Sequence, residues 1–223
     1  MNGTIIYLSS NREDPEFEKK IQEDLLSKAK DVPIISVTQK PIDLGTNICV
    51  GNVGTSGFNF IRQVQIACET AKSDFVIHAE ADCLYSPDYF DFIPPKLDIC
   101  YRNSNVYVQK YHQDFVCKKE GSTFSSIVGR RFYLDRLEYL FRDMPQWSTE
   151  YKNFPKEIRK LYFDKYEYFQ TDFSCVSFKT GKGMRKHSPS TEVPVYELPY
   201  WGNIKDLKKT VKKAWMELEV KIH

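Results

Sequence analysis

The sequence lacks a long hydrophobic run and lacks paired cysteine motifs. No stretch approaches the roughly 18 consecutive apolar residues that a membrane-spanning helix needs. The chain also starts without the basic and then apolar layout of a secretory signal peptide, so we expect a cytoplasmic protein with no membrane segment. The six cysteines stand singly, with no Cys-x-x-Cys pair for a structural zinc site, and we expect them to be reduced thiols.

Two common phosphate-binding motifs are absent as well. The glycine-rich stretch at residues 51–57 matches neither a P-loop, which needs Gly-Lys-Ser or Gly-Lys-Thr, nor a Gly-x-Gly-x-x-Gly fingerprint. We therefore expect its glycines to serve turns and the start of a helix.

Charge of one sign is not in excess over the whole chain, because the formal net charge is only +2. Residues 151–223, however, contain 15 basic and 9 acidic side chains. This basic last third indicates either an anionic acceptor, such as nucleic acid, or a solvated helix face. The solvated face is the more common explanation of such charge runs.

Strands and helices alternate in the first part of the chain. Thr4–Ser9 has the composition of a strand, and Asp14 is placed to cap a helix whose apolar residues recur at a helical interval. A second strand follows at Val32–Val37, and a second helix from Ser56 leads into a third strand at Phe75–Ala79. This order predicts an α/β fold of the Rossmann type, with a mostly parallel mixed sheet flanked by helices.

The pattern changes in the second part of the chain. Leu97–Tyr101 and Val106–Tyr111 read as two strands joined in a hairpin, and Phe173–Phe178 reads as a later strand. A last amphipathic helix starts at Ile204. No linker is evident, so we expect a single domain over residues 1–223, with a nucleotide half at about 1–100 and an acceptor half at about 101–223.

Two carboxylates, Glu80 and Asp82, directly follow the strand at Phe75–Ala79. Side chains alternate along an extended chain, so these two point the same way and are placed to share one cation. Mg²⁺ and Mn²⁺ take oxygen ligands and often bring a phosphorylated substrate with them. The polar turn Ser9–Arg12 follows the first strand in the same way, and ligands of such sheets collect beyond the carboxyl ends of strands. We expect one metal and diphosphate site there, with two solvated loop carboxylates as the alternative.

This order of parts resembles the GT-A glycosyltransferases, which use nucleotide-diphospho-sugars and a DxD-type metal motif. The resemblance implies a metal-dependent enzyme that moves a sugar from a nucleotide-diphosphate donor, such as a UDP-sugar, to an acceptor hydroxyl, with Mn²⁺ or Mg²⁺ as cofactor. The matching parts are the first strand and turn Ile5–Arg12, the helix Phe58–Lys72, the strand Ser73–Ile77, Glu80-Ala81-Asp82 in the place of DxD, and Ser125–Arg131, which is similar to a segment that lines the acceptor side.

The resemblance implies roles for residues in the first half of the chain. Ser9, Asn11 and Arg12 would hold the base and ribose of the donor. Asp82 would ligate the metal, while Glu80 would assist it or bind the ribose.

The resemblance also implies roles for residues further along the chain. His187 would be a further metal ligand, and Lys182 and Arg185 would stabilise the leaving phosphate. Asp172 would be the general base of an inverting reaction, with Glu167 as its competitor. A surface histidine and an aspartate that caps a turn are the plain alternatives.

The acceptor and two other functions stay open. A hydroxymethylated pyrimidine in DNA, as in virus-type DNA modification, is one acceptor, and a glycan or lipid carrier is another. Sugar-phosphate nucleotidyl transfer uses a related sheet, but the turn at Ser9–Glu13 is too short and acidic for the glycine-rich basic loop that this reaction needs. A non-catalytic nucleotide- or nucleic-acid-binding module is the last alternative.

Overall fold

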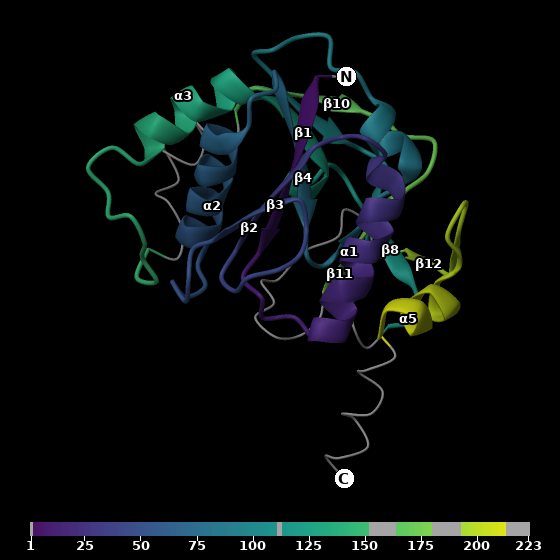
Figure 1. Ribbon diagram of the computed structural model, residues 1–223. Helices are drawn as coiled ribbons and strands as arrows, with labels where there is room; N and C mark the ends of the chain where they lie inside the picture. Colours follow the sequence, from purple (N-terminus) through teal and green to yellow (C-terminus); the bar gives the residue numbers. More distant parts are fainter. Residues whose placement is uncertain (1, 111–112, 152–163, 180–192, 213–223) are drawn as a thin grey trace.

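The computed structural model describes residues 2–110, 113–151, 164–179 and 193–212 (Figure 1). Its main feature is a seven-stranded sheet in the order β10-β6-β9-β4-β1-β2-β3. Six strands run the same way, and β9 is antiparallel to both of its neighbours. The predicted mostly parallel mixed sheet is therefore confirmed. The strands are β1 (Gly3–Ser9), β2 (Ile34–Thr38), β3 (Thr46–Cys49), β4 (Phe75–Glu80), β6 (Cys100–Asn103), β9 (Ser126–Gly129) and β10 (Tyr166–Phe169).

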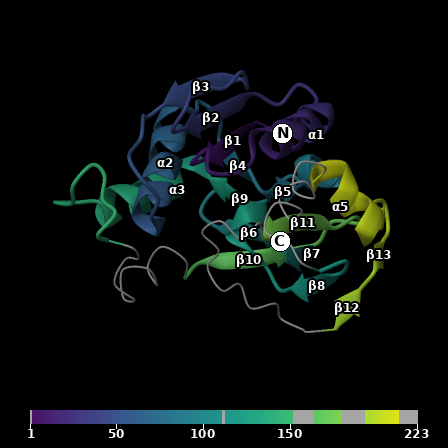
Figure 2. The same ribbon diagram turned by 90° about the horizontal axis from the view of Figure 1, so that it is seen from below.

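The three long helices start and pack as their sequences dictate. Asp14 caps α1 (Pro15–Ala29) by accepting backbone hydrogen bonds from Glu16 and Phe17. Ser56 caps α2 (Gly57–Thr70) in the same way. The third helix is α3 (Arg130–Leu140). Figure 2 shows α2 and α3 on one side of the sheet and α1 on the other, so both faces of the central strands are covered.

Strand β1 is buried along its whole length because of this double cover. Ile5 and Tyr7 belong to the cluster that includes residues of α1, whereas Ile6 and Leu8 belong to the cluster with α2 and α3. A strand covered on both faces needs a continuous apolar run rather than an alternating one. The order of β1 and β4 in the middle of the sheet places their carboxyl ends side by side.

A second sheet packs beside the first, in the order β12-β8-β7-β11-β5. The predicted hairpin is wrong, because β6 pairs in the first sheet and β7 in the second. The side chain of Asn103, at the end of β6, donates a hydrogen bond to Thr171 Oγ1 at 2.9 Å, so the link between the two strands contacts a distant segment. The strands are β5 (Cys83–Leu84), β7 (Val106–Lys110), β8 (Val116–Lys119), β11 (Cys175–Lys179) and β12 (Pro194–Val195), and the short 3₁₀ helices are η1 (Pro87–Asp91) and η2 (Thr123–Ser125).

The segment similar to an acceptor-side segment is part of the core. Ser126–Gly129 forms β9, which is fully buried between β4 and β6. Arg130 donates to the carbonyl of Ser73 at 2.9 Å, and Arg131 pairs with Asp135. These contacts stabilise the sheet and the start of α3, and a role of this segment on the acceptor side stays a prediction.

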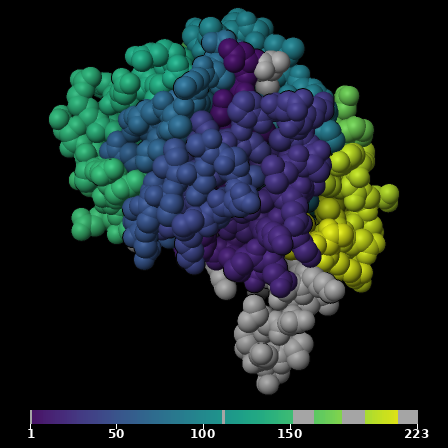
Figure 3. All heavy atoms as spheres, in the orientation of Figure 1, coloured from purple at the N-terminus to yellow at the C-terminus, as the bar shows by residue number. Residues whose placement is uncertain are grey.

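The end of the described chain packs on α1. Helix α5 (Ile204–Lys212) shares a buried cluster with Phe17 and Ile21 of α1, and Figure 3 shows this yellow segment beside the purple N-terminal part of the chain. A small ribbon, β13 (Glu197–Leu198) and β14 (Gly202–Asn203), precedes it. All six cysteines are free thiols. Among the described residues, no helix has the length and apolar character to cross a bilayer.

Candidate functional site

A cleft of about 170 Å³ lies at the carboxyl ends of β1 and β4. Its lining comes from the ends of β1, β2 and β4, the loop that leads into α2 and the first two turns of α2. The N-terminus of a helix attracts anions, because its first N–H groups have no partner within the helix. The cleft therefore combines two acidic side chains, Glu80 and Asp82, with the start of a helix, which favours negative charge. Ser9, Thr55 and Ser56 also line it.

The loop before α2 is held in place by side chains from other parts of the fold. Gly54 has a positive φ of 78°, and its carbonyl oxygen accepts hydrogen bonds from Gln39 at 2.8 Å and Asn59 at 3.1 Å. The hydroxyl of Ser56 accepts from the N–H of Asn59 and donates to the carbonyl of Ser148 at 2.6 Å. The glycines serve turns and a helix start, as predicted, and the loop also lines the cleft.

The three residues predicted to hold the base and ribose have different environments. Ser9 is buried and lines the cleft, where its hydroxyl accepts a hydrogen bond from Asn11 N–H at 2.8 Å. The side-chain oxygen of Asn11 accepts from Lys40 N–H at 2.8 Å, so it fastens the turn. Arg12 donates to Thr55 Oγ1 at 3.0 Å and so reaches the edge of the cleft. The structure thus places Ser9 in the cleft and Arg12 at its edge, whereas the side chain of Asn11 stabilises the turn.

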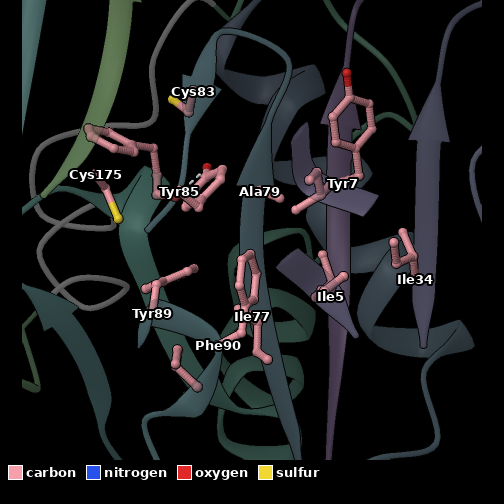
Figure 4. Close-up of a cluster of buried hydrophobic side chains, with 14 of the residues drawn as sticks. Ile5, Tyr7, Ile34, Ile77, Ala79, Cys83, Tyr85, Tyr89, Phe90 and Cys175 are labelled. Carbon is pink, nitrogen blue, oxygen red and sulfur yellow. Dashed lines mark hydrogen bonds between the residues drawn. The ribbon is translucent and has the colours of Figure 1, made fainter. Parts of the chain in front are cut away.

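Glu80 and Asp82 lie close together, but the predicted extended geometry is wrong, because Asp82 lies in the turn after β4. Glu80 ends β4, and one ligand atom each from Glu80, Asp82 and Cys83 lie within 4.8 Å of one another. Tyr85 holds this strand end, because its hydroxyl accepts from Glu80 N–H at 2.9 Å and donates to the carbonyl of Phe124 at 2.8 Å. Figure 4 shows Tyr85 packed beside β4 in the buried cluster.

The electrostatics of this group set which atoms can bind a cation. Burial and the neighbouring charge of Asp82 raise the pKa of Glu80 to about 7. Burial raises the pKa of the Cys83 thiol as well, and the thiol donates to Asp82 Oδ1 at 3.2 Å. A protonated thiol is a poor metal ligand. Two carboxylates, Glu80 and Asp82, are therefore the oxygen donors that fit a hard cation.

Two lysines belong to the same group and were not predicted from the sequence. Lys179 Nζ lies 2.9 Å from Asp82 Oδ2. Lys119 is within electrostatic range of Glu80, Asp82 and Lys179, and burial lowers its pKa. The one local signal for Lys179 is its position directly after the apolar strand at Phe173–Phe178.

The residues predicted to act as base lie away from the cleft lining. Asp172 comes before β11, whereas Lys179 at the opposite end of that strand contacts Asp82. The backbone N–H of Asp172 donates to Asp88. Glu167 lies on edge strand β10 and pairs with Lys96 at 3.2 Å, with both side chains about half exposed. The remaining predicted site residues, Lys182, Arg185 and His187, lie outside the described residues.

Comparisons with known proteins give similarities of fold. No protein-family model matches the chain, and no curated protein matches it significantly. The bifunctional IspDF of Campylobacter jejuni is 13% identical, with a TM-score of 0.47 over 86% of this chain and 56% of that chain. The fragment TarS 1-349 of S. aureus is 12% identical, with a TM-score of 0.43 over 81% of this chain and 60% of that chain.

A third similar structure is the apo-form glycosyltransferase GlyE of Streptococcus pneumoniae TIGR4. It is 9% identical, with a TM-score of 0.49 over 99% of this chain and 65% of that chain. The chain thus spans less than two thirds of the length of each of these three proteins. Similarities of this size do not identify a function, which has to be inferred from the residues of the cleft.

Proposed function

We propose that this protein is a glycosyltransferase that takes a sugar from a nucleoside-diphosphate donor, with Mn²⁺ or Mg²⁺ as cofactor. One observation carries the proposal: Glu80 and Asp82 converge in a cleft at the carboxyl ends of β1 and β4, beside the N-terminus of α2. Ligands of mostly parallel α/β sheets bind at this edge. Acidic donors for a cation and a helix end for an anion together suit a metal-bound diphosphate.

The residues present fit a divalent cation. Glu80 and Asp82 would hold it through carboxylate oxygens, which are the ligands that Mg²⁺ and Mn²⁺ prefer. When bound, such a cation stabilises the negative charge that builds on the leaving diphosphate. Ser9 and Thr55 would position the donor from the other sides of the cleft.

An inverting transfer needs a carboxylate within hydrogen-bond reach of the acceptor hydroxyl. Asp172 and Glu167 do not line the cleft, so we assign neither of them this role. Product stereochemistry, measured on the transferred sugar, decides whether a base is needed at all.

DNA and a glycan or lipid carrier are the two acceptor classes that we propose to test. On α5, Lys208 pairs with Asp114 at 3.1 Å and Lys209 pairs with Asp206 at 2.9 Å. These contacts favour a solvated helix face over a phosphate-binding surface in this part of the chain. Affinity for DNA would fall steeply as salt rises, whereas affinity for a neutral glycan would not.

The test is donor hydrolysis. The protein is incubated with a panel of nucleoside-diphosphate sugars, with and without Mn²⁺, and release of the nucleoside diphosphate is followed. We expect slow hydrolysis of one donor that depends on the cation. A nucleotidyltransferase would instead release pyrophosphate from a nucleoside triphosphate and a sugar phosphate. If no nucleotide sugar is hydrolysed and no nucleoside diphosphate binds in calorimetry, the proposed function is wrong.

The raised pKa of Glu80 predicts that cation binding depends on pH. A carboxylate must lose its proton to bind a metal, so a pKa of about 7 makes protons compete with Mn²⁺ near neutral pH. We expect the Mn²⁺ affinity, measured with the donor nucleotide present, to fall by about tenfold per pH unit below about pH 7. The nucleotide also titrates, so the pH dependence of the Mn²⁺ affinity is compared between the wild type and Glu80→Gln. The part of the slope that the variant loses belongs to Glu80. Equal slopes in the two proteins would contradict the prediction.

A further inference from the structure

Asp82 forms a shielded ion pair with Lys179, 97 positions later in the sequence. Their charged atoms are 2.9 Å apart, and the side chains are only 20% and 12% exposed. The backbone holds the pair, because Phe178 N–H donates to the carbonyl of Asp82 at 2.7 Å. A charge pair with little water around it interacts more strongly than one on the surface. The charge of Asp82 is therefore already balanced when no ligand is bound.

The four charged residues Glu80, Asp82, Lys119 and Lys179 are also balanced in charge when no ligand is bound. Glu80 and Asp82 supply two negative charges when ionised, and Lys179 and Lys119 supply two positive charges. A divalent cation alone would leave an excess of positive charge in a site that water reaches poorly, which is unfavourable. A diphosphate alone would leave an excess of negative charge. Only the two ligands together keep the group close to neutral.

We propose that Lys179 couples the binding of the divalent cation to the binding of the donor's diphosphate, so that neither ligand binds tightly alone. This inference rests on the proposed function of the cleft. Lysine suits the task, because its ammonium is a compact charge on a flexible stem and is a common phosphate ligand. Lys179 is not itself a lining residue of the cleft, but its ammonium lies 2.9 Å from Asp82, which is one. When Asp82 turns to the cation, this ammonium would pair with a phosphate oxygen instead.

Coupling of this kind has a measurable signature. The factor by which the diphosphate raises the affinity for the cation must equal the factor by which the cation raises the affinity for the diphosphate. We expect this factor to be about tenfold or more in the wild type. Lys179→Met removes the charge that competes for Asp82, so it should raise the affinity for Mn²⁺ alone and change the coupling factor from its wild-type value, while the direct attraction between the cation and the diphosphate remains.

The experiment measures binding and does not depend on turnover. Free Mn²⁺ is followed by electron paramagnetic resonance as protein is added, without nucleotide and then with UDP, CDP, GDP, ADP or dTDP. Calorimetry gives the affinity for the same nucleotides with and without Mn²⁺. Lys179→Arg keeps the charge and should keep the coupling. Lys118→Met is the matched control, because Lys118 contacts Tyr107 and Asn105, and its coupling should equal that of the wild type.

The outcomes separate the two proposals. Wild-type protein that binds Mn²⁺ alone as tightly as with a nucleotide overturns the coupling but leaves the proposed function standing. Nucleotide binding that is equally tight with and without Mn²⁺ does the same. A folded Lys179→Met variant with wild-type coupling overturns the role of Lys179. If none of the nucleotides binds with or without Mn²⁺, the proposed function fails and this inference fails with it.

Discussion

Asp82→Asn is expected to abolish sugar transfer and donor hydrolysis while the fold stays intact. The amide has no charge to offer a divalent cation, and the loss of one group that stabilises charge in the transition state costs about 10²–10³-fold in rate. The substitution also leaves the buried Lys179 ammonium without its partner, so we expect a lower melting temperature. Rates are therefore measured well below the melting temperature, with circular dichroism as the check on folding.

Asp114→Asn is the matched control for this substitution. Asp114 also pairs with a lysine, Lys208, but its side chain is 53% exposed and lies outside the cleft lining. Breaking an exposed pair costs about 0–1 kcal/mol, so stability and turnover should stay close to those of the wild type. Unaltered sugar transfer by Asp82→Asn would falsify the metal assignment. Loss of activity in both variants would show that the effect is not specific to the cleft.

Acid is expected to unfold this protein through His78. The imidazole is fully buried on β4, and neither ring nitrogen has a hydrogen-bond partner among the described residues. Burial lowers the pKa of His78 from 6.5 to about 3. Between these two values the unfolded chain takes up a proton that the folded chain does not, so stability falls as the pH is lowered. The loss should reach about 4 kcal/mol near pH 3.

Two substitutions of His78 test this prediction by urea unfolding over a series of pH values. His78→Leu should remove this part of the pH dependence and raise the stability at neutral pH by about 1–3 kcal/mol, because a buried polar group without a partner is replaced by an apolar one. His78→Gln should also remove the pH dependence but give no gain at neutral pH, since its amide stays buried and polar. If both variants keep the acid slope of the wild type, His78 is not its cause.

The candidate site was predicted in part. Glu80 and Asp82 both line the cleft, Glu80 from the last position of β4 and Asp82 from the turn that follows it, since they are only two residues apart. Ser9 lies on the same side of the sheet because β1 and β4 pair in parallel. Asp172 and Glu167 were predicted as candidates for the base from their order along the chain alone, and the structure places them outside the cleft lining. Order says which strand a residue precedes, but it does not say which end of that strand faces the site.

The local chemistry of the chain determined the caps at Asp14 and Ser56, the double-covered strand β1 and the acidic pair at the end of β4, since each depends on residues only a few positions apart. The tertiary structure alone decided that β6 and β7 lie in different sheets and that Lys179 meets Asp82. Such contacts join residues far apart in sequence, and their free energy exists only once the intervening chain has folded and excluded water.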